Sequence, residues 1–184
     1  MASPLLVLAL LDVLVPCMTL AQFTEPTLLV PHLLSEQRDA AIAELSQRLE
    51  NARRIEDASA FANAVMEHEA LASAVFDGVA FPLARGQAVK TLSFCVGLSQ
   101  RGFRWGAGKG PAVHTVVLFA VPLAEGETHL SLLLTFSNFL KDAMALATLR
   151  RCAQPEEMLA NLNNVRVLRR GTHASGAGDA LAEY

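Results

Sequence analysis

Five histidines carry most of the chemistry available to this chain at neutral pH. A neutral imidazole nitrogen is a good nucleophile and metal ligand near pH 7. His129 begins the apolar face of a predicted helix, so its side chain is expected to point toward the protein body, and His68 lies close to the apolar stripe of another helix. The remaining three, His32, His114 and His173, lack carboxylate or cysteine partners at ligand spacing. We therefore predict no metal site.

The three cysteines indicate a reducing compartment. Cys17, Cys95 and Cys152 are far apart, odd in number and without the close pairing of a zinc site or a redox motif. They are predicted to be small buried residues, and a cytoplasmic location follows from that interpretation.

The composition indicates one globular domain that does not bind nucleic acid. The chain has 184 residues, of which 52% are hydrophobic and 18% charged. Its net charge of −3 and scattered basic residues provide no positive face for a phosphate backbone. The glycine-rich segment 106–110 departs from the Walker pattern at Phe103 and Gly110, so we predict a loop there and no bound cofactor.

The two ends of the chain need separate interpretations. The apolar run Leu5–Leu11 resembles the hydrophobic part of a signal peptide, but no basic residue precedes it, and Asp12 and Pro16 interrupt it. We predict a buried helix or strand and no stable membrane insertion, with export as the alternative. Residues 171–184 are predicted to form a flexible tail behind a single domain of residues 1–170.

Helices and strands alternate along the domain. Ser35 can cap a first amphipathic helix, a second is predicted to start near Asp57 or Ser59, and two more are predicted from Thr128 and Pro155.

Two strands are predicted between these helices, because residues 92–97 alternate in polarity and residues 116–121 form an unbroken apolar run. Asp77-Gly78 predicts a turn, and the four glycines of Gly102–Pro111 predict a loop. The fold class is α/β, with helices on both faces of the sheet.

The segment Gly78-Val79-Ala80-Phe81-Pro82-Leu83-Ala84-Arg85 resembles a known signature. It is similar to the Gly-Val-Ala-Ile-Pro-His-Ala-Arg motif of enzyme IIA domains of bacterial sugar phosphotransferase systems, of the fructose, mannitol and nitrogen-regulatory type. The likeness continues through Trp105-Gly106, residues 113–121, Glu127-Thr128-His129-Leu130 and Pro155–Leu159, and covers roughly residues 30–165. The resemblance implies a central mixed sheet.

The resemblance also implies which residues matter. In that family, the histidine at the position of Leu83 accepts a phosphoryl group from the carrier protein HPr and passes it to a IIB domain, while a histidine matching His129 supports the phosphate. Leucine has no lone pair and cannot form a phosphoramidate. His68 stands where the family commonly has arginine, and Ser73 stands in the region of the family's Gly-Ser-Thr-Gly turn. With Arg85, which can attract a phosphate or form a surface ion pair, they are the candidate binding residues.

These observations predict a regulatory or protein-binding module that is unable to carry phosphate. Its partner would be an HPr-like or IIB-like protein, a sensor or a transporter domain. The alternative is an active phosphocarrier that uses His129, and a third interpretation is a small ligand in the pocket beside Leu83. Trp105 can pack in the core or form part of a docking surface.

Overall fold

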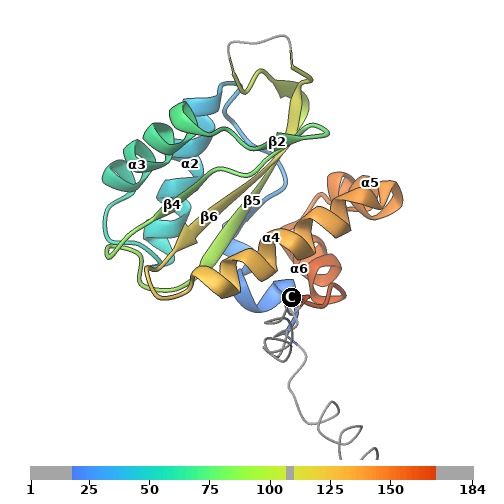
Figure 1. Ribbon diagram of the computed structural model, residues 1–184. Helices are drawn as coiled ribbons and strands as arrows, with labels where there is room; N and C mark the ends of the chain where they lie inside the picture. The colour runs from blue at the N-terminus through green and yellow to red at the C-terminus, as the bar shows by residue number, and fades with distance from the viewer. Residues whose placement is uncertain (1–17, 107–109, 169–184) are drawn as a thin grey trace, which may run out of the picture.

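Two long antiparallel strands, β5 (Ser93–Phe103) and β6 (Val113–Val121), form the centre of the sheet in the computed structural model, which describes residues 18–106 and 110–168 (Figure 1). The strand order is β1-β5-β6-β3-β2, with β4 also paired to β6. Four short strands complete it: β1 (Leu29–Val30), β2 (Val75–Phe76), β3 (Val79–Ala80) and β4 (Leu83–Arg85). β1 pairs in parallel with β5, β3 and β4 pair in parallel with β6, and β2 pairs antiparallel with β3, so the sheet is mixed, as predicted.

Strands β3 and β4 follow the same edge of β6, one after the other. Val79 lies opposite Thr115, and Leu83 lies opposite Phe119. The predicted turn at Asp77-Gly78 connects β2 to β3, and its two residues have φ values of 48° and 74°. Positive φ at both positions gives a two-residue hairpin the twist that its strands need.

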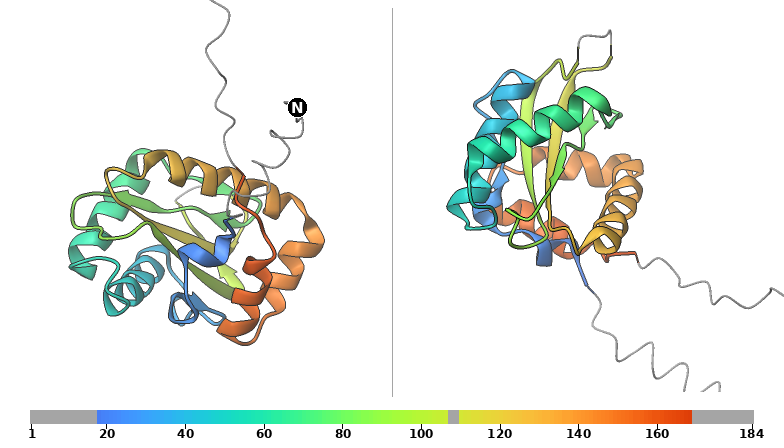
Figure 2. Two further views of the ribbon diagram at one scale, coloured as in Figure 1. Left: turned by 90° about the horizontal axis from the view of Figure 1, so that it is seen from below. Right: turned by 60° about the vertical axis from the view of Figure 1, so that its left-hand side comes forward.

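Helices cover both faces of the sheet (Figure 2). Helices α2 (Arg38–Asn51) and α3 (Ala58–Leu71) lie on one face, and α4 (Gly126–Lys141), α5 (Ala143–Arg151) and α6 (Pro155–Asn163) on the other. Two short 3-10 helices, η1 (Leu20–Phe23) and η2 (Pro26–Leu28), precede β1. Every residue of the predicted run 116–121 is buried, as expected for a strand covered on both sides.

Each face has its own apolar core. The core beneath α2 and α3 contains Ile42 and Leu45, which carry the helical spacing seen in the sequence. The opposite core contains Phe94, Phe119 and Phe136, and the rings of Phe94 and Phe136 meet edge to face with centroids 4.9 Å apart. Such aromatic contacts add to the free energy of burial.

Most of the predicted helix starts are confirmed. The Asp57 carboxylate accepts a hydrogen bond from the Ala60 N–H at the start of α3, and Pro155 is the first residue of α6. The prediction for Ser35 is wrong, because α2 begins only at Arg38. Ser35 instead donates its hydroxyl hydrogen to the Glu44 carboxylate, with the oxygens 2.7 Å apart.

Other boundaries differ from the sequence predictions. The loop predicted from Gly102 begins later, because β5 continues to Phe103 beyond an irregularity in its register with β6. Helix α5 was not predicted. Cys95 and Cys152 are buried as expected, whereas Cys17, the run Leu5–Leu11 and the tail 171–184 lie outside the described residues.

In the described ranges, no single helix is long and apolar enough to cross a membrane. Helices α4 and α5 satisfy the length and composition requirement only as a pair, which is bent by 94°.

Candidate functional site

Leu83 and His129 come together where β4 and β6 end and the chain enters α4. Leu83 lies opposite Phe119 in the register of the two strands. The Phe119 ring packs against the His129 imidazole with a centroid distance of 5.2 Å and an interplanar angle of 72°. Phe119 thus bridges the strand position of Leu83 and the first turns of α4.

A pocket of about 390 Å³ opens at this place. Its volume falls in the range typical of small-molecule sites. The residues that line it come from β4, the end of β6, the connection to α4 and the start of α4: Leu83, Arg85, Val121, Ala124, Gly126, Glu127, His129 and Leu130. The half-buried Leu83 therefore contributes hydrocarbon to the wall of the pocket that also contains His129.

His129 is a buried polar side chain, and one of its two ring nitrogens is unpaired among the described residues. Its exposed fraction is 8%, and its buried Nε2 has no hydrogen-bond partner in the part of the chain that the structure describes. Burial lowers the pKa of the imidazole below its ordinary value of 6.5, and the positive charge of Arg85 lowers it further. The ring is therefore neutral at pH 7, with one nitrogen carrying a lone pair and the other a hydrogen.

Arg85 gives the mouth of the pocket a positive charge. Its guanidinium donates a hydrogen bond to the Leu123 carbonyl oxygen. A Cβ built on Gly126 would lie 3.3 Å from Nη2 of Arg85, so the guanidinium lies close to the first turn of α4. The free backbone N–H groups of a first helical turn also favour an anion. Glu127 places a carboxylate in the same wall. Among the residues described, Arg85 forms no ion pair.

The two other candidate binding residues lie outside this pocket. His68 is exposed near the end of α3, and its side chain makes no polar contact with the described residues. Ser73 lines a different cavity of about 320 Å³, together with Trp105. The structure thus brings together Leu83, Arg85 and His129, and separates them from His68 and Ser73.

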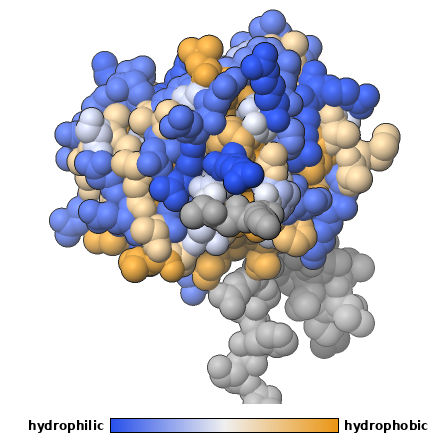
Figure 3. Space-filling model, turned by 90° about the horizontal axis from the view of Figure 1, so that it is seen from above, coloured by the Kyte–Doolittle hydropathy of each residue, from blue (hydrophilic) through white to orange (hydrophobic). Residues whose placement is uncertain are grey.

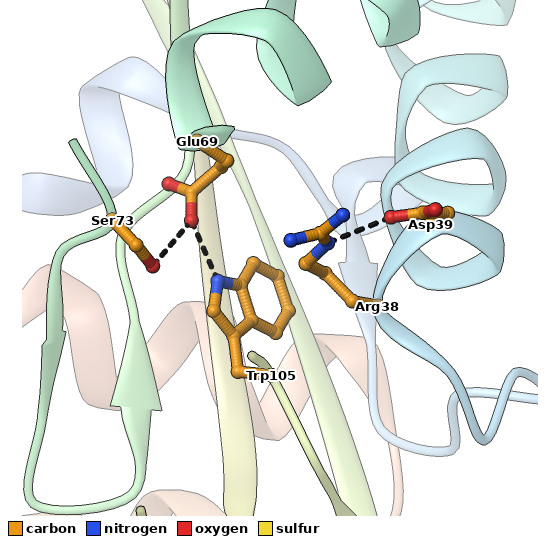
Figure 4. Close-up of polar contacts among 5 residues, drawn as sticks. All are labelled: Arg38, Asp39, Glu69, Ser73 and Trp105. Atoms are coloured by element: carbon orange, nitrogen blue, oxygen red, sulfur yellow. Dashed lines mark hydrogen bonds and ion pairs between the residues drawn. The ribbon is translucent and has the colours of Figure 1, made fainter. Parts of the chain in front are cut away.

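A buried carboxylate beside Ser73 was missed by the sequence analysis. Glu69 is only 4% exposed, and its Oε2 accepts hydrogen bonds from the Ser73 hydroxyl and the Trp105 indole N–H, each at 2.7 Å (Figure 4). Glu69 follows Phe61 and Val65 at intervals of four residues. Because this spacing puts the Glu69 carboxylate on the apolar face of the helix, it could have predicted a buried carboxylate.

Trp105 belongs to the core, which resolves the choice left open by the sequence. Its side chain is 4% exposed and packs near the Phe103 ring, with centroids 6.0 Å apart. The indole N–H needs an acceptor when it is buried, and Glu69 provides it.

Comparison with known proteins identifies the family. The model of the family "Phosphoenolpyruvate-dependent sugar phosphotransferase system, EIIA 2" matches residues 22–165. The PTS system 2-O-alpha-mannosyl-D-glycerate-specific EIIABC component of Escherichia coli (strain K12) is 34% identical over 130 residues, which are 69% of this chain and 20% of that protein. The chain thus spans about a fifth of the length of this curated relative.

Solved structures share the fold. The nitrogen regulatory protein IIA-Ntr from Neisseria meningitidis has a TM-score of 0.70 and 19% identity, with 77% of this chain and 97% of that chain covered. For IIA mannitol from Escherichia coli the TM-score is 0.65 and the identity 17%, with 76% and 98% covered. The Escherichia coli complex of enzyme IIAMTL with phosphorylated enzyme IIBMTL gives a TM-score of 0.65 at 17% identity, with 76% and 96% covered.

The fold similarity and the match over residues 22–165 agree with the resemblance found in the sequence. This chain belongs to the EIIA 2 family of the phosphoenolpyruvate-dependent sugar phosphotransferase system.

Proposed function

We propose that this chain is a cytoplasmic, protein-binding regulatory module of a bacterial phosphotransferase system that does not carry a phosphoryl group. The proposal rests on Leu83, whose hydrocarbon side chain occupies the wall of the pocket that also contains His129. By resemblance, this is the position of the family's phosphate-accepting histidine. Leucine offers no lone pair to phosphorus and makes the pocket less favourable for an anion.

The proposed partner is a protein such as an HPr-like or IIB-like domain, a sensor or a transporter domain. One related structure is a complex of enzyme IIAMTL with phosphorylated enzyme IIBMTL, which supports a protein partner for this chain as well.

The surface around the pocket is also suited to docking. Leu123 and Leu130 are 48% and 42% exposed beside it, and Arg85 adds a positive charge. Apolar residues with a few charges are typical of protein interfaces. Figure 3 draws the opposite end of the molecule, where β5 ends and β6 begins, and there hydrophobic residues are scattered among hydrophilic ones.

A second candidate function is phosphotransfer through His129 itself. The observation that favours it is the neutral imidazole, whose buried Nε2 has no partner among the residues described. A nucleophile must also reach the phosphorus of a donor protein, and a side chain that is 8% exposed offers little access. Accessibility therefore supports the regulatory proposal over the carrier.

The test is transfer of labelled phosphate from phosphoenolpyruvate through enzyme I and HPr. The native chain should remain unlabelled, and the Leu83→His variant should accept label because the nucleophile returns to a surface that still docks the donor. Leu83→Asn is the matched control, since it adds polarity without an imidazole, and it should stay unlabelled.

Two outcomes would contradict the proposal. Label on the native chain that disappears in His129→Ala would establish the carrier function. A folded Leu83→His variant that takes no label would argue against a surviving docking surface for the phosphate donor.

A further inference from the structure

A cavity separate from the two described above lies at the opposite end of β6 from His129. Its volume is about 490 Å³. It is formed by the segment after β1, the bulged part of β5, the start of β6 and the connection from α5 to α6: His32, Leu98, Ser99, Gln100, His114, Arg150, Arg151, Cys152 and Ala153. His114 is seven positions before Val121, which borders the first pocket, and seven steps along a strand correspond to about 23 Å. The two cavities are therefore distinct.

The wall of this cavity contains basic groups and no carboxylate among the described residues. Arg150 and Arg151 end helix α5, and His32 and His114 also line the cavity. No acidic group of the described chain lies within 4.0 Å of either arginine's guanidinium. The acidic side chains whose charges reach the wall come from outside the lining: Asp77 acts on Arg150, and Glu157 acts on Cys152.

Arg150 is held in place by neutral acceptors. Its Nε donates to the hydroxyl of the fully buried Thr115 at 3.2 Å, and its Nη2 lies 3.4 Å from the Gly78 carbonyl oxygen. Burial lowers the pKa of this guanidinium, and the charge of Asp77 opposes that shift. A half-buried cation bonded only to neutral groups is incompletely compensated, so an anion in the cavity would lower its free energy.

Other polar groups of the wall are also fixed. His114 Nδ1 lies 3.2 Å from the Ser99 carbonyl oxygen, and His32 Nδ1 lies 3.5 Å from the Gln100 amide nitrogen. The Arg151 side chain, by contrast, has no hydrogen bond to the described residues and is exposed at the edge of the cavity. A guanidinium in such a place is suited to planar recognition of a phosphate or carboxylate.

We propose that this cavity binds a small-molecule dianion, held by Arg150 and Arg151 at the end of α5. The cavity has the size of a metabolite site rather than that of a single ion. This inference goes beyond the proposed function and does not depend on Leu83 or His129. It gives a regulatory module a site for a chemical signal that is separate from the surface proposed for its protein partner.

Calorimetric titration with glycerol 3-phosphate, inorganic phosphate and succinate, all at constant ionic strength, tests the proposal. At least one of these dianions should bind the native chain saturably at one site. Preference for glycerol 3-phosphate would identify a phosphate monoester as the ligand class, and preference for succinate a dicarboxylate. Failure of all three to saturate would overturn the inference.

Arg151→Gln removes one cation without removing a hydrogen bond of the described fold. Affinity should fall at least about tenfold, the factor expected for one charge-assisted hydrogen bond. Arg104→Gln is the matched control, because this exposed arginine lines the cavity beside Trp105. Equal weakening by both variants would show non-specific attraction to positive charge and would overturn the proposal.

The site of binding is checked by amide chemical shifts in the native chain. Residues 98–100, His114 and Ala153 should respond to the dianion, because they line the cavity. A response centred on Gly126 and His129 would place the anion in the first pocket instead and would contradict the assignment.

Discussion

Two buried polar side chains on opposite faces of the sheet differ in their hydrogen bonding. Glu69 on α3 is 4% exposed, and its carboxylate accepts from Ser73 and Trp105. His129 on α4 is 8% exposed, and its Nε2 has no partner in the described structure. Native proteins rarely leave a buried polar atom unpaired. The hydrogen-bonded carboxylate therefore belongs to the architecture, whereas the imidazole, unpaired among the described residues, is the candidate for a functional role.

Removing the Trp105 indole, which donates to Glu69, should have the largest effect on the free energy of unfolding. Trp105→Ala should lower the free energy of unfolding by about 3–5 kcal/mol, because a large buried ring is lost and the Glu69 carboxylate loses a donor. Urea unfolding measures the effect. Arg104→Ala, at the exposed neighbouring position, should change the same free energy by less than about 0.5 kcal/mol.

A smaller change isolates the hydrogen bond to the carboxylate. Trp105→Phe keeps an aromatic ring but removes the N–H donor, and should cost about 1.5–3 kcal/mol because the buried Glu69 side chain loses one of its two donors. Ser73→Ala should cost less, since Ser73 is exposed and water can replace its hydroxyl. We infer that Trp105 is the more important of the two donors to Glu69. Greater destabilisation of Ser73→Ala than of Trp105→Phe in urea would contradict this inference.

The unpaired site should respond differently to loss of its polar group. His129→Leu removes a buried nitrogen that has no partner among the described residues, so the free energy of unfolding should change by no more than about 1 kcal/mol, in either direction. A loss of 2 kcal/mol or more in the same urea experiment would show that the imidazole makes a stabilising contact and would remove the contrast with Glu69.

The smallest expected effect is a pH dependence. The pKa of His129 is lower in the folded chain than its ordinary 6.5, so the unfolded chain binds the proton more tightly. The stability contribution of the neutral ring is therefore complete above pH ~6.5, and declines as the pH falls from there to the folded-state pKa. Native protein should lose more stability across that window than His129→Leu. Equal losses, or an NMR titration of the imidazole above 6.5, would contradict the lowered pKa.

Local sequence patterns predicted the elements that carry the site, but not all of its surroundings. The spacing of Ile42 and Leu45 predicted α2. The family resemblance implied that Leu83 and His129 belong to one site, and the structure places both in the wall of one pocket. Helix α5 escaped notice, although Asp142 caps it with two hydrogen bonds from backbone N–H groups, because its apolar residues continue the pattern of α4.

Contacts between distant segments could not be predicted from periodicity. Glu69 and Trp105 are 36 residues apart, and Arg150 reaches Thr115 across 35 residues. These pairs depend on how the helices pack on the sheet, which short-range spacing does not encode. The same reason hid the separation of His68 and Ser73 from the pocket of Leu83 and His129.

The most direct test of the account is the intact mass of the native chain after incubation with phosphoenolpyruvate, enzyme I and HPr. The account predicts an unchanged mass, because Leu83 offers no nucleophile and the His129 side chain is only 8% exposed. A mass increased by one phosphoryl group, with the modification located on His129, would contradict it and would make the unpaired imidazole the working residue of an active carrier.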